Sequence, residues 1–216
     1  MKKYRPTLQY LLIDITKEKW SVQQLSSALF SSHLGGNALA LYLYDLYRKE
    51  YSSNYEVEPL VFSPGLFTQM NLFDGTSFSI AGRSSTSHEV HSTQCIAPFA
   101  SSICSCGFNA IVLVGSARKP IIVEISEEQV LFTPSERLHG KDIPSTYEAL
   151  DLAKDKSAIL IGPAGEQQVP FSSLIANNRS IEREGFGALL GAKRVKALVI
   201  QRGEYVYESM NQDEVV

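Results

Sequence analysis

The chain has 216 residues, of which 44% are hydrophobic and 20% charged, and its formal net charge at pH 7 is −3. This length suits one domain, and the weakly acidic charge excludes the basic surface by which proteins bind nucleic acids. No apolar run approaches the ~18 residues needed to cross a bilayer, and the basic residues Lys2 and Lys3 are not followed by the apolar stretch of a signal peptide. We therefore expect a cytoplasmic protein with no membrane span and no nucleic-acid partner.

Hydrophobic periodicity and turn residues predict the elements of the first half. Leu39, Leu43 and Leu46 recur at a spacing that is typical of an amphipathic helix. Apolar runs next to Pro64-Gly65 and Asp74-Gly75 are typical of strands that adjoin turns. The expected elements are strands over 8–16, 57–62 and 76–81 and a mostly helical segment over 26–47.

The second half repeats this form. Segments 110–114 and 121–125 predict a hairpin, and Ser145 followed by Glu148 predicts a capping box at the start of a helix over 145–154. Because strands and helices do not strictly alternate, the order favours an α+β fold rather than a doubly wound sheet. The remaining expected elements are strands over 158–161 and 197–201 and a short helix near 186–190.

We expect one compact unit over residues 1–202, followed by a loose or partner-bound tail over 203–216. The acidic ending Asn211–Glu214 offers little apolar material for a core, and chain ends of this kind are often poorly ordered. Two independent domains joined by a flexible linker would contradict this prediction.

Glycine-rich turns follow apolar segments in a fixed order along nearly the whole chain. Glycine at such joints lets the backbone approach a bound anion or another chain closely. The landmark segments are Leu11–Thr16, Leu34–Ala40, Pro59–Gly65, Gly107–Val112, His139–Asp142, Gly162–Glu166, Glu182–Ala188 and Gly191–Lys193. Their order resembles that of the N-terminal domain of the aldehyde ferredoxin oxidoreductase family. In that family the domain forms the saddle beneath a tungsten or molybdenum bis-pterin cofactor.

The resemblance implies a fold for this chain and shows how the domain is used in longer enzymes of the family. The family domain is α+β, with mixed sheets in two related halves that pack around a pseudo-twofold axis, and we expect the same here. Family enzymes are much longer, and their iron–sulfur cysteines and substrate-channel residues lie in helical domains after this one. The chain also resembles a stand-alone paralogue of this domain that accompanies a full-length family member in enteric bacteria.

A saddle for a dianionic cofactor should offer backbone amides, glycines and cations, and the resemblance implies four such places. The first is the glycine turn before Asn37, for which a plain helix entry is the alternative. The second contains Arg83, which could instead be a solvated surface charge. The third includes Gln94, and in the fourth Arg183 could instead pair with neighbouring glutamates. The implied cofactor-binding residues are Gly35, Gly36, Asn37, Arg83, Ser84, Gln94, Arg183, Gly185 and Gly187.

Five positions depart from the family's pattern in ways that oppose an anionic ligand. Ser77 stands where the family has an arginine, and serine cannot form a bidentate contact with phosphate. Ile96 and Ala97 replace paired glycines, so side chains lie where backbone would touch the ligand. Glu182 and Glu184 replace two further glycines, and a carboxylate repels a nearby anion. We therefore expect no tungsten, molybdenum, iron or pterin in the isolated chain; the alternative is a bis-pterin carrier or half of a split enzyme.

Cysteines and histidines do not form a convincing metal or catalytic site in the sequence. His88, His91 and Cys95 supply three donors in a spacing that is not a recognised zinc pattern. Cys104 and Cys106 are too few for an iron–sulfur cluster, and we interpret them as small buried residues on a helix. The sequence also lacks a nucleophile elbow, a Walker loop and a dinucleotide fingerprint. We expect no catalytic residue and no metal ligand.

These departures favour a non-catalytic paralogue that serves as an accessory subunit or assembly factor. Its expected partner is a full-length tungsten or molybdenum oxidoreductase acting on aldehyde or oxo groups, or another subunit of a redox complex, and self-association stays open. We expect the former cofactor face to be an interaction surface around the segments 35–37, 83–85 and 183–187. Its apolar patch is predicted to comprise Phe62, Phe67, Phe73, Ile96 and Phe186.

Overall fold

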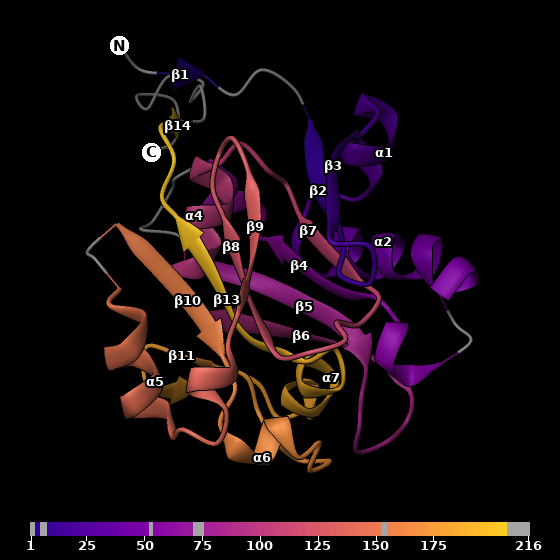
Figure 1. The fold of residues 1–216 in the computed structure, drawn as a ribbon. Helices are drawn as coiled ribbons and strands as arrows, with labels where there is room; N and C mark the ends of the chain where they lie inside the picture. The colour runs from indigo at the N-terminus through magenta and orange to yellow at the C-terminus, as the bar shows by residue number, and fades with distance from the viewer. Residues whose placement is uncertain (1–2, 5–7, 52–53, 71–75, 153–154, 207–216) are drawn as a thin grey trace.

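The computed structural model describes residues 3–4, 8–51, 54–70, 76–152 and 155–206. Two six-stranded mixed sheets face one another, with helices between them and on their outer faces (Figure 1). The α+β fold expected from the sequence is therefore confirmed. A further pair of short parallel strands, β1 (Lys3–Tyr4) and β14 (Tyr205–Val206), joins segments near the two chain ends.

The first half of the chain forms the first sheet and its helices. Its elements are β2 (Gln9–Asp14), β3 (Lys19–Gln24), α1 (Ser27–Ser32), α2 (Gly36–Tyr51), η1 (Tyr55–Val57), β4 (Leu60–Pro64), α3 (Leu66–Gln69), β5 (Ser77–Arg83), β6 (Val90–Ile96), α4 (Phe99–Ser105) and β7 (Ile111–Val114). The strands pair in the order β3-β2-β7-β4-β5-β6. Strand β7 is buried along its whole length between β2 and β4, which explains why its sequence is purely apolar.

The second half repeats the strands of the first and three of its helix positions, without a counterpart of η1. Its elements are β8 (Ile121–Ile125), β9 (Val130–Pro134), η2 (Glu136–Leu138), α5 (Ile143–Leu150), β10 (Lys156–Leu160), α6 (Pro163–Glu166), β11 (Ile175–Ala176), β12 (Arg179–Ser180), α7 (Phe186–Ala192) and β13 (Val195–Gln201). The strand order β9-β8-β13-β10-β11-β12 matches that of the first sheet, including the parallel pairs β2–β7 and β8–β13. Helices α2, α3 and α4 correspond to α5, α6 and α7, so the prediction of two related halves is confirmed.

The main core lies between the two sheets. Helices α4 and α7 contribute Phe99 and Phe186 to it, and both side chains are fully buried among residues from both sheets. On the outer faces, α2 covers the first sheet through Leu43 and Tyr44, while α5 covers the second through Tyr147. Burial of one large apolar side chain contributes roughly 1.5–3 kcal/mol, so the shared core holds the two halves together.

The predicted hairpin of segments 110–114 and 121–125 is wrong. Strands β7 and β8 belong to different sheets, and β8 instead pairs with β9. Both segments are almost entirely apolar, because each strand is buried on both faces. A run of apolar residues does not indicate which strand it pairs with. The chain changes sheet at Gly115, whose φ of +77° and close packing against Thr16 require glycine.

Other boundaries also differ from the prediction. The segment 26–47 contains two helices, because the chain breaks at His33 and turns through Gly35 at a φ of +106°. Helix α5 is capped by Asp142, whose carboxylate accepts a 2.9 Å hydrogen bond from the backbone amide of Ser145, so Ser145 is not the N-cap. The helix ends before Asp151, which adopts a left-handed conformation. Strands β3, β6 and β9 were not predicted, since they are edge strands with mixed or polar sequences.

The described part of the C-terminal segment contacts the domain. The backbone amide of Gly203 donates a 3.1 Å hydrogen bond to Ser105 Oγ, and β14 pairs with β1. The predicted tail over 203–216 thus begins with bonded residues, and its remainder, 207–216, lies outside the described residues.

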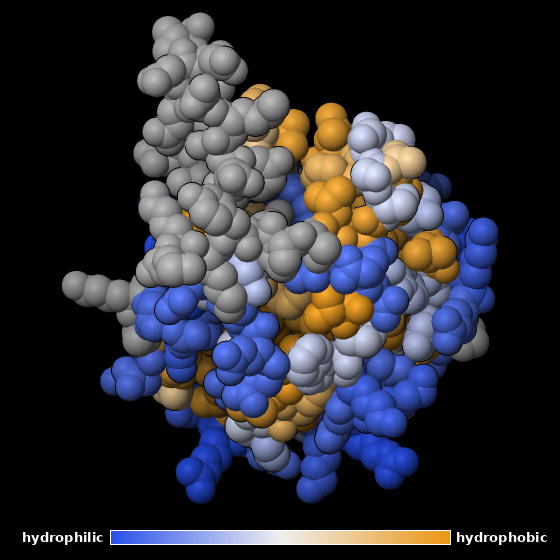
Figure 2. All heavy atoms as spheres, turned by 90° about the horizontal axis from the view of Figure 1, so that it is seen from above, coloured by the Kyte–Doolittle hydropathy of each residue, from blue (hydrophilic) through white to orange (hydrophobic). Residues whose placement is uncertain are grey.

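Seen from above, the molecule exposes apolar atoms between polar ones (Figure 2). Among the described residues, no helix combines the length and the hydrophobicity that a bilayer crossing needs.

Candidate functional site

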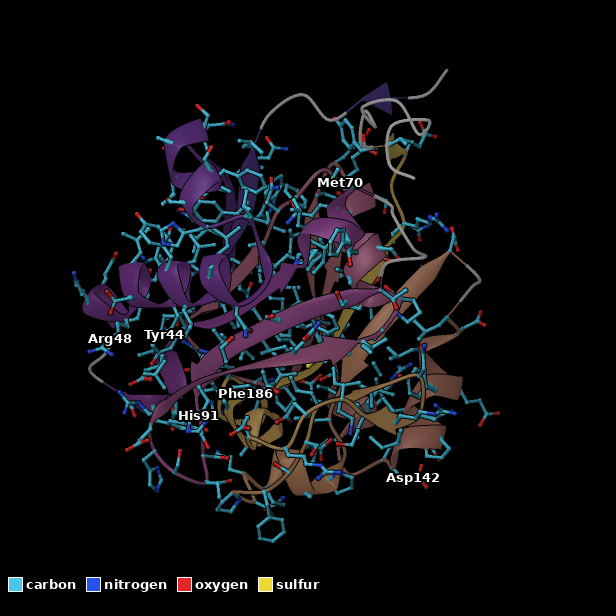
Figure 3. The ribbon with its side chains drawn as sticks, turned by 180° about the vertical axis from the view of Figure 1, so that it is seen from behind. Tyr44, Arg48, Met70, His91, Asp142 and Phe186 are labelled. Carbon is cyan, nitrogen blue, oxygen red and sulfur yellow. The ribbon has the colours of Figure 1, made fainter. Side chains whose placement is uncertain are left out.

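Edge strand β6 brings the four predicted places together (Figure 3, where His91 marks the start of the strand). Ser92 Oγ donates a 2.8 Å hydrogen bond to Asn37 Oδ1, which joins the first and third places. Ser84 Oγ donates a 2.8 Å hydrogen bond to the backbone oxygen of Glu184, which joins the second and fourth. His91, directly before the third place, has its Nδ1 3.0 Å from the Glu184 carboxylate of the fourth. The four segments therefore lie next to one another around β6.

The third and fourth places are equivalent positions of the two halves. Gln94 and Ile96 lie on β6 just before α4, and Glu182 to Gly185 lie just after β12 and before α7. Burial raises the pKa of the Cys95 thiol to about 12, with a smaller contribution from Glu182, which lies near it. The pseudo-symmetric segments thus meet along β6.

Glu182 fills the fourth place with its own carboxylate. Its oxygens accept hydrogen bonds from the backbone amides of Leu174 and Glu184, both at 2.7 Å, and of Phe186 at 3.4 Å. The residue is only 4% exposed. Burial raises the pKa of Glu182, and the backbone hydrogen bonds oppose this rise. Amides that would face an anion at this turn are therefore already bonded within the chain.

Arg83 is also paired within the chain. Its Nε lies 2.8 Å from both carboxylate oxygens of the buried Glu58, and its guanidinium donates a 2.7 Å hydrogen bond to the backbone oxygen of His88. The Tyr44 hydroxyl donates a further 2.8 Å hydrogen bond to Glu58. The hydrogen bond from Arg83 to Glu58 raises the pKa of the guanidinium. Its charge is thus neutralised inside the protein, where a ligand phosphate would otherwise need it.

The glycines of the face are required by contacts inside the domain. Gly185 has a φ of +77°, and a Cβ there would lie 2.0 Å from the backbone oxygen of Pro170. At Gly35, with a φ of +106°, a Cβ would lie 2.3 Å from Gln69 Nε2. At Gly187 it would lie 2.6 Å from a backbone oxygen. These close approaches account for all three glycines without a bound ligand.

The part of the face that remains open surrounds the end of β6. A hollow of about 670 Å³ lies there, between β6 and the β11–β12 hairpin. Gln94 and Ile96 line one side and Arg179 lines the other, and all three are exposed. Arg183 is exposed as well, whereas Ser84 and Gly185 are buried. The rim that this face offers to other molecules thus combines the uncharged Gln94 and Ile96 on one side with Arg179 on the other.

The predicted apolar patch is largely wrong. Phe62 and Phe186 are fully buried, because they belong to the core between the sheets, where the Phe186 ring packs against Gly82. Phe67 and Ile96 are exposed, at 58% and 74%. Phe73 lies outside the described residues. Ile96 is therefore the member of the predicted patch that lies on the face along β6.

Two of the three cysteines, Cys95 and Cys106, are situated as unreactive thiols. Cys95 and Cys106 are buried, and burial raises the pKa of Cys106 to about 11. Cys104 lies on α4 and is partly exposed. Within the described ranges, no group of three His, Cys, Asp or Glu side chains is arranged to hold a metal ion. Thiols whose pKa lies this far above neutrality are poor nucleophiles and poor metal ligands.

Sequence reasoning missed a buried lysine that connects the two halves. Lys193, at the end of α7, donates hydrogen bonds to the backbone oxygens of Glu56 at 3.1 Å, of Gly115 at 3.2 Å and of Glu58. Burial lowers the pKa of Lys193 to about 7, and the Glu58 carboxylate opposes this shift. A lysine directly after the apolar run of α7 was the only signal in the sequence. The acceptors lie at least 78 positions away, so no local pattern indicates them.

Comparison with known proteins identifies the domain. Residues 10–202 match the family model described as aldehyde ferredoxin oxidoreductase, N-terminal domain. This match covers most of the chain. The chain belongs to this family. The landmark order of glycine turns thus indicated the correct family, and the two related halves described above are the two halves of the family domain.

Relatives and solved structures agree with this assignment. The chain is 25% identical to the tungsten-containing aldehyde ferredoxin oxidoreductase of Thermococcus kodakarensis, over 92% of the chain and 34% of the relative. It is 23% identical to the aliphatic sulfonate oxidoreductase, WOR-like subunit, of Pyrococcus furiosus, over 87% of the chain and 33% of the relative. The BamBC active-site complex of benzoyl coenzyme A reductase has the same fold, with a TM-score of 0.83 and 22% identity over 96% of the chain and 32% of that structure. The chain therefore spans about a third of the length of these proteins.

Proposed function

We propose that this chain is a non-catalytic form of the family's pterin-cofactor domain, which acts in the cytoplasm as an accessory subunit or assembly factor of a larger redox complex. The observation that carries the proposal is the carboxylate of Glu182, bonded to backbone amides at the turn where the resemblance places an anionic cofactor. A ligand that carries phosphates would have to displace this buried carboxylate and tolerate its charge.

The other residues of the face do not fit a dianionic pterin either. The positive charge of Arg83 is bound to Glu58, and Ser77 cannot replace the arginine that it stands for. Ile96 occupies a position where the family's glycines let backbone approach the ligand. We therefore derive no chemical step through a cofactor, and catalysis is expected of the partner.

The names and lengths of similar proteins support a role in a larger assembly. One relative is named as a subunit, and the similar solved structure is an active-site complex. In both, the matching region is about a third of a longer chain, so the domain adjoins further protein there. We propose that a full-length family member or another redox subunit covers the open rim around Gln94, Ile96 and Arg179. A stable contact of this kind would bury at least ~1,000 Å².

Metal and pterin analysis tests the cofactor half of the proposal. The chain is produced in cells supplied with tungstate and molybdate, together with a full-length family enzyme as the positive control. Elemental analysis and pterin fluorescence after oxidation are then measured on both proteins. We expect metal and pterin in the control and neither at stoichiometric level in the chain. Stoichiometric metal with bound pterin in the chain would establish the other candidate, a cofactor carrier or half of a split enzyme.

The variant Glu182→Gly makes the same test more specific. It restores the residue type that the resemblance implies and frees the backbone amides of Leu174 and Glu184. If the carboxylate is what closes this place, the variant should retain more pterin than the wild-type chain. Equal and negligible pterin in both proteins would show that Glu182 alone does not exclude the cofactor.

A further inference from the structure

A second hollow lies next to α6 and α7. Figure 1 shows these two helices at one end of the second sheet. It has a volume of about 220 Å³ and shares no residue with the face along β6. Its walls come from the loop before β8, the start of β13, η2 and α6. Its polar lining residues include Arg118, Lys119, Ser135, Glu166, Arg194 and Lys196.

The side chains around this cavity carry an excess of positive charge. The buried Lys196 pairs with Glu166 and also donates a 3.0 Å hydrogen bond to the backbone oxygen of Lys141. Glu166 accepts a further 2.7 Å hydrogen bond from the backbone amide of Gly140, and His139 Nδ1 lies 3.4 Å from it. The single carboxylate of the lining is thus fully engaged.

Within the described part of the chain, the cations at the rim have no comparable partner. Arg118 is exposed, and Lys119 lies 3.8 Å from Glu136 with 80% of its side chain exposed, which is a weak contact. Arg194 is held in place by hydrogen bonds to the backbone oxygens of Ala117 and Arg118, which leave its charge uncompensated. A concave site with this balance of charge attracts anions.

Ser135 adds a second, independent indication of a ligand. It lines the cavity and is only 1% exposed, and its Oγ has no hydrogen-bond partner among the described residues. Buried hydroxyls in native proteins are nearly always bonded, because an unpaired one loses its hydration without compensation. A ligand oxygen in the cavity would supply the missing partner.

The residue equivalent to Glu166 in the first half is packed differently. There α3 corresponds to α6, and its last residue, Gln69, is buried and accepts a 2.6 Å hydrogen bond from Asn109 while donating one to Pro64. Gly35 packs so closely on Gln69 that a Cβ would not fit. In the second half, Gly140 has open space where its Cβ would lie, with no atom within 4 Å. Among the described residues, the second half is therefore more open around Glu166 than the first half is around Gln69.

We propose that this cavity binds a small anion with a carboxylate or phosphate group. Arg118, Lys119 and Arg194 would attract and hold the anion, and the Ser135 hydroxyl would donate a hydrogen bond to it. The volume is smaller than the roughly 300–1,000 Å³ of sites for drug-sized ligands, which limits the ligand to a few heavy atoms beyond its anionic group.

Nuclear magnetic resonance titration of the ¹⁵N-labelled chain tests the proposal. Inorganic phosphate and succinate are added in separate arms, with chloride at matched ionic strength as the control for screening. We expect saturable shifts of amide signals around the cavity, including those of Gly140 and Gly191, with at least one of the two anions. Binding of phosphate alone or of succinate alone would assign the preferred group, and saturation by neither would overturn the proposal.

Variants make the location testable. The double variant Arg118→Gln with Lys119→Gln should bind roughly three- to thirtyfold more weakly, because two charge contacts are lost. Ser135→Ala removes a hydroxyl that has no partner in the free protein, so it should fold normally and bind roughly two- to tenfold more weakly. Lys49→Gln on α2 is the matched control and should bind like the wild type. An unchanged affinity in both cavity variants would overturn the proposal.

Discussion

The backbone amide of Glu184 donates a 2.7 Å hydrogen bond to the carboxylate of Glu182, two residues earlier in the chain. The turn before α7 therefore carries its own anion, which also accepts from Leu174 and Phe186. Backbone amides at such a turn commonly bind phosphate or carboxylate groups of ligands. Here the carboxylate of Glu182 occupies the amides instead, so their hydrogen bonds stabilise the turn.

Removal of this carboxylate should destabilise the domain. Glu182→Ala leaves buried amides without acceptors, and each such group costs roughly 1–3 kcal/mol, so we expect a loss of about 3 kcal/mol in the free energy of unfolding. Glu182→Gln keeps one acceptor oxygen and should lose about half as much. Urea denaturation measures both. Glu184→Ala removes only a partly exposed contact to His91 and should cost less than ~1 kcal/mol; equal losses for Glu182→Ala and Glu184→Ala would refute this account.

Gly185 should tolerate no side chain. In Gly185→Ala the added Cβ meets the backbone oxygen of Pro170 and the residue keeps a left-handed conformation, so we expect a loss of more than ~3 kcal/mol. Gly140→Ala is the matched control, because Gly140 has a nearly equal φ of +75° but open space around its Cβ. It should lose only the ~1 kcal/mol of backbone strain. Thermal unfolding of the two variants separates the contact from the strain, and similar losses would contradict the contact.

The sequence predicted the elements that have strong local signals. The strands β7, β8 and β13 are apolar runs, and the glycine turns before α2 and α7 occur in the order of the family, which indicated both the fold and the face along β6. Pairing was not predictable, because apolar strands buried on both faces look alike whichever sheet they join. The edge strands β3, β6 and β9 were missed, since a strand that is exposed on one side needs little hydrophobicity.

Long-range contacts account for the errors in the candidate site. Arg83 lies at the end of β5, and its partner Glu58 lies 25 positions away, with no sequence pattern that links it to Arg83. Phe186 was assigned to the surface because it adjoins the glycines of the turn, whereas the tertiary packing of α7 between the two sheets buries it. Lys193 bonds to residues that are far away in the sequence, so a local sequence pattern cannot predict its contacts.

Lys193 should make stability depend on pH. Its pKa falls from 10.5 to about 7 on folding, so between these values the unfolded chain holds a proton that the folded chain does not. Burial of Lys193 costs no free energy of ionisation above pH 10.5, where the amine is neutral in both states. This cost to folding grows as the pH falls towards 7, because the unfolded chain then gains a proton that the folded chain does not. We therefore expect the free energy of unfolding to increase from pH 7 to about pH 8, by less than ~1.4 kcal/mol per pH unit. Cys95 and Cys106 oppose this rise, because burial raises their pKa values in the folded chain while their thiols begin to ionise in the unfolded chain as the pH approaches about 8.5.

Denaturation of wild type and Lys193→Met at several pH values checks this expectation. The variant has no amine to titrate, so its stability should not rise over this range, even if it is lower overall. A wild-type curve that is flat or falls between pH 7 and 8, or a variant with the same rise as the wild type, would show that Lys193 does not titrate as described.

The last prediction concerns the interaction face and rests on the proposed function. Ile96 is 74% exposed beside the hollow at the end of β6, so Ile96→Asp should leave the fold intact and weaken association with a full-length family partner by at least tenfold. Leu131→Asp is the control, because Leu131 is also exposed but lies on β9 in the other sheet. Phe186→Asp cannot serve as a test, since a charge in the core between the sheets would unfold the domain.

Association is measured by calorimetry with purified proteins, and circular dichroism monitors the fold of each variant. Weaker binding of Ile96→Asp together with normal binding of Leu131→Asp places the partner on the rim that Gln94 and Arg179 share with Ile96. If instead Ile96→Asp binds as the wild type does, the partner uses another surface. In that case no partner role remains for the face along β6, and the hydrogen bonds of Glu182 there serve the stability of the domain.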